Sequence, residues 1–176
     1  MNARGWGFVA GLMVGLVLVV IFYKIANTDK KIKTEYDERQ QRIRGKAYKY
    51  GFYTMIFYHV LMMGLYLCGI TIPVEPYVAE CFGIILGCTV LGTYCVWNDV
   101  YWGLNNDHKR YYIIFGVCLL FNLIPVAVPA LTGEFERHGF GGAPMINLFI
   151  MIMMAILLIE LGIKHLIDKK KDDEED

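Results

Sequence analysis

Three polar side chains, His59, Thr89 and Asn122, each lie about halfway along a different apolar stretch of the sequence. Polar groups are costly in hydrocarbon, so such side chains usually face the interior of a helical bundle and pair there. Because an imidazole titrates near neutral pH, the three could form a site that binds a solute or transfers a proton. They could instead form a hydrogen-bonded cluster that joins three helices. We favour the cluster, because we expect no carboxylate within the membrane beside His59.

A second set of polar and charged residues lies in two segments, 34–52 and 97–111. Its members are Asp37, Glu38, Arg39, Arg42, Lys46, Asp99, Tyr101, Asn105, Asp107 and Lys109. They could form a surface that binds a partner protein, anionic lipid headgroups or a small anion. They could also form salt bridges between helices, each worth about 0–1 kcal/mol where exposed. Elsewhere, Glu160 has Lys164 four residues later, and we interpret these two as an ion pair at the membrane surface.

Cysteines recur every seven residues in one stretch, at Cys81, Cys88 and Cys95. No Cys-x-x-Cys or Cys/His metal spacing is present. The same stretch contains three glycines, Gly83, Gly87 and Gly92. We therefore interpret this face as small residues that let helices pack closely. A disulfide between Cys68 and Cys81 stays open as an alternative.

Glycines also repeat every four residues near the start of the chain, at Gly7, Gly11 and Gly15. This spacing gives two overlapping small-xxx-small units, which let helix backbones approach closely in lipid. The first helix should therefore dock on the other helices or on another copy of the protein.

Sequence motifs for phosphate binding, dinucleotide binding, serine hydrolysis and zinc proteolysis are absent. Glu134, Glu136 and His138 could hold a metal only weakly, since a single histidine accompanies two carboxylates. We expect no metal, no cofactor, no enzymatic activity and no nucleic-acid binding.

The elements that position these residues follow from composition, since 56% of the residues are apolar and 14% are aromatic. A helix needs roughly 20 apolar residues to cross about 30 Å of hydrocarbon. The sequence contains five such runs, at residues 6–23, 50–71, 80–97, 111–131 and 143–163. Backbone groups in lipid must satisfy their own hydrogen bonds, so each run should be a helix. The fold class is therefore all-α, a polytopic membrane protein with five transmembrane helices.

Basic residues indicate the orientation of these helices. Fifteen of the seventeen Lys and Arg residues lie in the 24–49 segment, the 98–110 loop and the C-terminal tail. Arg4 and Arg137 are the other two. The positive-inside rule puts the first three regions in the cytoplasm, which gives an N-out, C-in topology.

Helical spacing continues into the charged segment before the second run. Glu35–Arg39 and Glu38–Arg42 are i,i+4 pairs with the acid first, which favours a helix. Apolar residues share one face at Tyr36, Ile43, Ala47 and Tyr50. We predict a charged amphipathic cytoplasmic helix between spans 1 and 2; a solvated linker is the alternative.

Two stretches resemble a known family. "DERQQRIRGKAYKYGF", residues 37–52, resembles the opening motif of small uncharacterised multi-pass membrane proteins of Gram-positive bacteria. "WNDVYWGLNNDHKRY", residues 97–111, is similar to the later cytoplasmic loop of that family. The resemblance covers roughly residues 36–131, and it implies a bacterial inner-membrane location and no particular activity.

Together these patterns predict one transmembrane bundle over residues 1–168 and a charged, disordered tail over 169–176. The expected function is that of a non-enzymatic scaffold, regulatory or accessory protein that presents a charged cytoplasmic surface. The alternative is a small transporter or channel that uses the polar site in the middle of the membrane. The expected partners are anionic headgroups at the cytoplasmic face and a protein partner or another copy of the chain.

Overall fold

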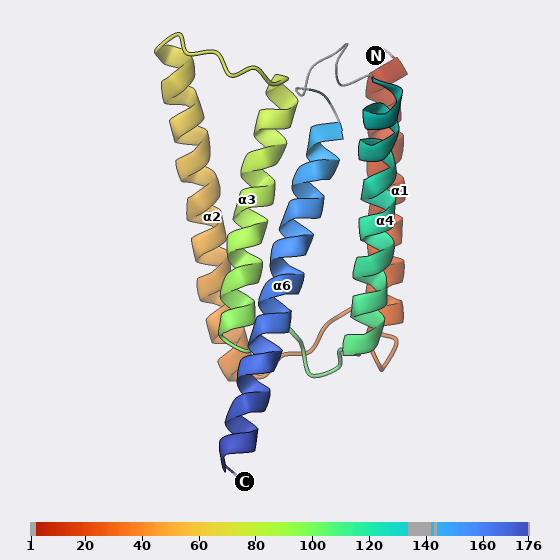
Figure 1. Ribbon diagram of the computed structural model, residues 1–176, viewed down its shortest axis with the longest axis vertical. Helices are drawn as coiled ribbons and strands as arrows, with labels where there is room; N and C mark the ends of the chain where they lie inside the picture. Colours follow the sequence, from red (N-terminus) through yellow and green to blue (C-terminus); the bar gives the residue numbers. More distant parts are fainter. Residues whose placement is uncertain (1–2, 134–141, 143, 176) are drawn as a thin grey trace. The chain divides into compact units, whose positions relative to one another are not determined.

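The computed structural model describes residues 3–133, 142 and 144–175, and all of its regular elements there are helices. They are α1 (Ala3–Ala26), α2 (Glu38–Leu67), α3 (Pro76–Trp97), α4 (His108–Thr132) and α6 (Pro144–Glu175) (Figure 1). The predicted all-α class is confirmed, and each of the five apolar runs overlaps one helix. Three helices are long and apolar enough to cross a membrane, namely α3, α4 and α6 over Pro144–Lys170.

The chain divides into two compact units, where the sequence predicts one bundle over 1–168. The first unit consists of residues 1–37 and 102–116, and the second consists of 38–101 and 117–176. Different forces hold each unit together. Hydrogen bonds between polar loops organise the first unit, and helix packing organises the second.

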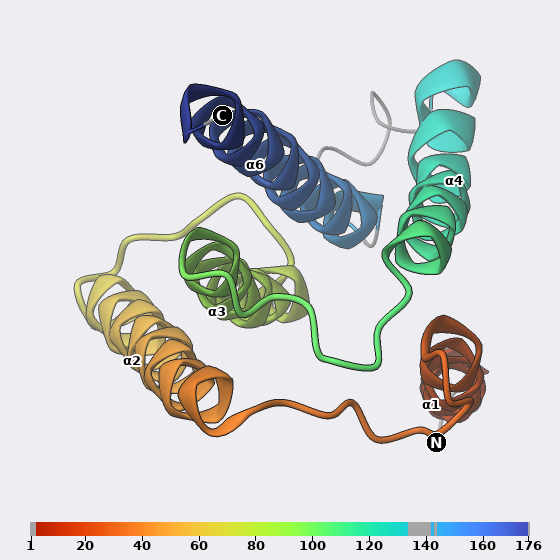
Figure 2. The ribbon, with the colours of Figure 1, turned by 90° about the horizontal axis from the view of Figure 1, so that it is seen from below.

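Helix packing in the second unit centres on α3, which contacts both α2 and α6. Figure 2 shows these three helices from below, with α3 next to each of the others. The backbones of α2 and α3 approach most closely at two glycines. A Cβ atom added to Gly51 would lie 2.8 Å from the carbonyl oxygen of Gly87, so only glycine fits there. On its other side, α3 places Gly92 against Leu157 of α6.

The sequence predicts that the glycines and cysteines of α3 pack against other helices. The structure agrees for the glycines but not for all three cysteines. Gly83, Gly87 and Gly92 are all buried. Of the three cysteines, Cys95 is buried, Cys81 is half-buried and Cys88 is exposed. The seven-residue repeat is therefore not a single packed face. Cys68 and Cys81 are both free thiols, so the alternative of a disulfide between them is wrong.

The glycine repeat of α1 is open at the two positions whose surroundings the structure describes. A Cβ atom added to Gly11 or Gly15 would meet nothing within 4 Å. The surroundings of Gly7 lie outside the described residues. Docking of this face, on the other helices or on a second copy of the chain, stays a prediction.

Two helix boundaries differ from the expected ones. The helix of α6 continues to Glu175, so residues 169–175 are helical where the sequence predicts a disordered tail. Lysine and glutamate favour helices and no glycine or proline interrupts this end, which explains the extension. Glu35 precedes the start of α2 and its carboxylate lies 3.5 Å from Lys31 Nζ, so the predicted Glu35–Arg39 helix pair is wrong.

Candidate functional site

The three polar side chains predicted to meet in mid-membrane hydrogen-bond elsewhere. His59 Nε2 lies 3.1 Å from Glu80 Oε2. Thr89 Oγ1 donates to the Ile85 carbonyl, and Asn122 Nδ2 donates to the Cys118 carbonyl, both at 2.8 Å. No hydrogen bond described in the structure joins His59, Thr89 and Asn122 to one another. Two of the three therefore satisfy their own helix, and the predicted cluster is not formed.

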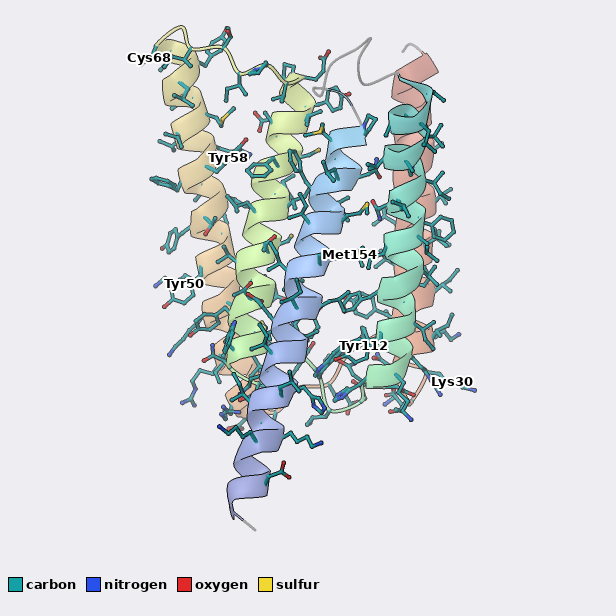
Figure 3. The ribbon with its side chains drawn as sticks, in the orientation of Figure 1. Lys30, Tyr50, Tyr58, Cys68, Tyr112 and Met154 are labelled. Atoms are coloured by element: carbon teal, nitrogen blue, oxygen red, sulfur yellow. The ribbon has the colours of Figure 1, made fainter. Side chains whose placement is uncertain are left out.

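Glu80 is a carboxylate beside His59 that the sequence analysis did not expect. The predicted third run begins at Glu80, whereas α3 begins at Pro76 and brings Glu80 fully into the helix. Proline at the first turn of a helix is a common start signal and could have revealed this boundary. Next to the pair, Tyr58 extends from α2 toward α3 (Figure 3) and donates to the Ala79 carbonyl at 2.9 Å.

The His59–Glu80 pair lines a cavity of about 410 Å³ between the end of α2, the following loop and the start of α3. The other walls are mostly apolar and include Met62, Tyr66 and Ile72. Both polar side chains are partly exposed, at 43% for His59 and 65% for Glu80. An imidazole beside a carboxylate can exchange protons with it, so this cavity is the best candidate for solute or proton chemistry.

A second carboxylate, Glu160, lies inside the apolar part of α6. Its Oε1 accepts a hydrogen bond from Thr93 Oγ1 of α3 at 3.1 Å, while its Oε2 is buried with no partner among the described residues. The predicted Glu160–Lys164 pair is wrong. Lys164 Nζ lies 3.0 Å from Asp168 and 3.2 Å from Asp99, because it points toward the charged end of α3.

Asp99 joins two helices through Lys164, although its own side chain is 56% exposed. It follows the end of α3 with a left-handed φ of 58°, which places its carboxylate against Lys164 of α6. On the other side of the same loop, Arg44 Nη1 donates to the Val100 carbonyl at 3.2 Å. Tyr101 packs against the buried cluster of Ala47, Cys95 and Val100. For Asp99 and Tyr101, the helix-joining interpretation of the charged set is the better one.

Asparagines organise the polar loops of the first unit. Asn105 is 7% exposed, and its side chain donates to Asp29 Oδ1 and to the Lys33 carbonyl. Its Oδ1 accepts from the backbone amide of Glu35 at 2.9 Å. The predicted role of Asn105 in a binding surface is therefore wrong, because the side chain is buried and all its groups are bonded.

The same network contains two further asparagines. Asn106 Nδ2 donates to Asn27 Oδ1 at 2.7 Å, and Asn27 is fully buried. Gly103 fits tightly beside Thr34 and the Glu35 carbonyl, so no larger residue can occupy this position. The run "GLNND" from 103 to 107 is thus the element that ties the loop after α1 to the loop before α4.

Charge at the edge of this network is arranged in short-range pairs. The backbone amide of Lys31 donates to Asp29 and lowers the pKa of that carboxyl. A hydrogen bond to Asp29 likewise raises the pKa of the Lys31 ammonium. Arg110 Nε lies 2.9 Å from Asp107, and Lys109 is exposed. Of the predicted binding residues in this unit, Asp37 and Lys109 therefore remain accessible.

Basic side chains form an exposed row along the start of α2. Arg39, Arg42, Lys46 and Lys49 are all exposed and are spaced by three, four and three residues, so they share one helix face. Within the described part of the chain, no carboxylate forms an ion pair with any of them. Asp37 and Glu38, beside Arg39, are exposed as well. Four of the ten predicted surface residues, Glu38, Arg39, Arg42 and Lys46, are therefore exposed on α2.

A second cavity, of about 640 Å³, lies between α2 and α3 next to this basic row. Its walls include Tyr50, Tyr53 and Phe57 of α2 and Tyr94 and Trp97 of α3. The rings of Tyr50 and Tyr94 stand 5.0 Å apart. This groove was not predicted from the sequence, although aromatic residues at helical spacing on α2 were a usable signal.

The residues that the structure describes contain no group of three or more His, Cys, Asp or Glu that could hold a metal. The weak candidate set Glu134, Glu136 and His138 lies outside the described residues. Comparison of the chain with protein-family models, with curated proteins and with solved structures finds no match. The resemblance to small membrane proteins of Gram-positive bacteria stays a prediction.

Proposed function

We propose that the protein is a five-span protein of the bacterial cytoplasmic membrane with its N-terminus outside and its C-terminus inside. It acts as a non-enzymatic scaffold or accessory protein, which presents the charged start of α2 to a protein partner. Three helices of sufficient length and apolarity support the membrane location. The concentration of Lys and Arg in the 24–49 segment, the 98–110 loop and the tail supports the orientation.

The observation that carries the scaffold role is the contrast between bonded and open charges. Charged side chains near the ends of α3 and α6 pair with one another, as Asp99 and Lys164 do. Arg39 and Arg42 are exposed at the start of α2, on a helix that continues without interruption into apolar sequence. Charges held on a rigid helix but left open to solvent suit recognition of an acidic partner surface.

Site-specific photocrosslinking in cells tests this role. A photoreactive residue in place of Arg42 should give a discrete protein adduct, whereas the same residue at Tyr48, which is also exposed on α2, should not. Arg39→Glu should abolish the Arg42 adduct, since charge reversal repels an acidic partner. Equal adducts from positions 42 and 48, or an adduct that survives Arg39→Glu, would contradict the proposal.

Transport is the second candidate function, and the His59–Glu80 pair in its cavity favours it. A proton-coupled carrier needs a titratable group open to a cavity, and this pair meets that condition. The two candidates differ in whether reconstituted protein moves protons or solute across a bilayer. A flux that requires His59 would support transport over the scaffold role.

A further inference from the structure

The groove between α2 and α3 has a shape and a lining that suit a hydrocarbon chain. It extends along α3 from Trp97 to Thr89, which is about 12 Å at 1.5 Å per residue. Tyr50, Tyr94 and Trp97 surround one end, while Phe57 and Val90 line the other. Tyrosine and tryptophan concentrate where a membrane meets water. The groove therefore leads from an interfacial, aromatic end toward an apolar end.

The threonine and asparagine side chains in the groove are already bonded to the protein. Four of them use their donors internally: Thr54 Oγ1 to the Tyr50 carbonyl (2.9 Å), Thr89 Oγ1 to the Ile85 carbonyl (2.8 Å), Thr93 Oγ1 to Glu160 (3.1 Å) and Asn98 Nδ2 to the Tyr94 carbonyl (2.8 Å). With these donors engaged, the threonines present mainly methyl groups to the groove. A polar solute would therefore gain few hydrogen bonds there, whereas an acyl chain needs none.

Two lysines of the basic row stand at the aromatic end of the groove. Lys46 and Lys49 are exposed and lie one turn apart on the same face of α2. Lys49 Nζ lies 5.8 Å from the centre of the Tyr53 ring, and Tyr53 is itself a wall of the groove. The Lys49 ammonium therefore lies at the rim of the groove. A lipid whose chain entered the groove would have its phosphate at this rim.

We propose that this groove binds one anionic phospholipid, with its phosphate beside Lys46 and Lys49 and an acyl chain between α2 and α3. The assignment rests on the proposed membrane placement of α2 but not on a protein partner. The positive charge of the lysines at the rim favours an anionic headgroup. The threonine and asparagine side chains that line the groove are already hydrogen-bonded, which favours an acyl chain over a polar solute. Arg42 and Arg39 lie about one and two turns before Lys46, farther from the groove, and remain available to a partner.

Native mass spectrometry of the purified full-length protein tests the site. The protein is titrated with phosphatidylglycerol and with phosphatidylcholine that carries the same acyl chains. One phosphatidylglycerol should bind with clear preference over phosphatidylcholine. The double variant Lys46→Gln, Lys49→Gln should weaken phosphatidylglycerol binding about thirtyfold, from about fivefold per lysine, and leave phosphatidylcholine unchanged.

Two further variants separate the headgroup from the chain. Val90→Trp fills the apolar end and should weaken both lipids equally. The matched control Arg39→Gln, Arg42→Gln removes the same charge from the same helix face and should retain the preference. Adding inorganic phosphate should not displace the bound lipid, because the acyl chain supplies part of the binding.

Several outcomes would overturn the lipid site. They are equal binding of the two lipids, an equal loss in the arginine control, displacement by inorganic phosphate, or a dimer that V90W dissociates in place of a lipid adduct. The lysine variants alter exposed side chains, so they decide the matter even if Val90→Trp does not fold. Since the purified protein is used, loss of the crosslinked partner would not affect this result.

Discussion

At the residue scale, what a polar side chain does depends on which helix face lies opposite it. His59 meets Glu80, Glu160 meets Thr93, and Lys164 meets Asp99. None of these partners follows from spacing along one helix, because they depend on how α2, α3 and α6 are rotated about their axes. Sequence could therefore predict that His59 and Glu160 need partners, but not which partners they find.

We predict that His59→Gln will fold with nearly unchanged stability, because glutamine can still donate a hydrogen bond to Glu80. His59→Ala should lower the free energy of unfolding more than glutamine does, within about 0–1 kcal/mol for a partly exposed pair. Thermal unfolding of the purified variants measures this. In proteoliposomes with a pH-sensitive dye, the scaffold role predicts no proton flux in either protein. A flux in the wild type that His59→Gln abolishes would instead favour transport.

We predict that Asn105→Ala will loosen the polar loops of the first unit. The backbone amide of Glu35 loses its acceptor, Asn105 Oδ1. The carboxylate of Asp29 loses a donor, Asn105 Nδ2. The loss should be about 1–3 kcal/mol for a buried unsatisfied group. Hydrogen exchange at the Glu35 amide should accelerate, whereas Lys109→Ala, at an exposed position, should leave it unchanged. Unchanged exchange in Asn105→Ala would show that the network does not depend on this side chain.

At the element scale, the positions of the helices could be predicted well from the sequence. The contacts between helices could be predicted only in part. Every apolar run overlaps a helix, and three of these helices, α3, α4 and α6, are long and apolar enough to cross a membrane. The glycines of α3 were correctly interpreted as packing residues, whereas Gly11 and Gly15 of α1 meet nothing within 4 Å and their docking stays a prediction. Small-residue spacing says that a helix can be approached closely, but it does not say that another helix lies there.

We predict that Gly51→Ala will destabilise the second unit. The added Cβ atom would lie 2.8 Å from the Gly87 carbonyl oxygen, so the backbones of α2 and α3 must separate. Overpacking of this kind lowers stability by about 1–3 kcal/mol. Gly64→Ala is the matched control on the same helix, because nothing lies within 4 Å of its Cβ position. Thermal unfolding in detergent compares the two, and equal unfolding temperatures would mean that the close approach is not needed.

At the scale of the whole molecule, charge and hydropathy together decide how the chain is placed in a membrane. Leu104 and Gln41 lie in segments whose basic residues favour the cytoplasm. Cys68 follows α2 at its other end, is exposed and is a free thiol, so in the proposed orientation it reports on the outer side without any substitution. An odd number of spans requires the two termini to lie on opposite sides of the membrane.

We predict the following labelling pattern with a thiol reagent that does not cross membranes, applied to intact cells. A protein that retains only Cys68 should be labelled from outside. Variants that carry only Gln41→Cys or only Leu104→Cys should be labelled after the membrane is opened, and Asn2→Cys should be labelled from outside. Asn2→Cys separates the five-span from the four-span arrangement, since α1 either crosses or remains in the cytoplasm. External labelling of Gln41→Cys would show that the orientation is the reverse of the proposed one. Labelling of Asn2→Cys only in opened cells would show that α1 does not cross the membrane.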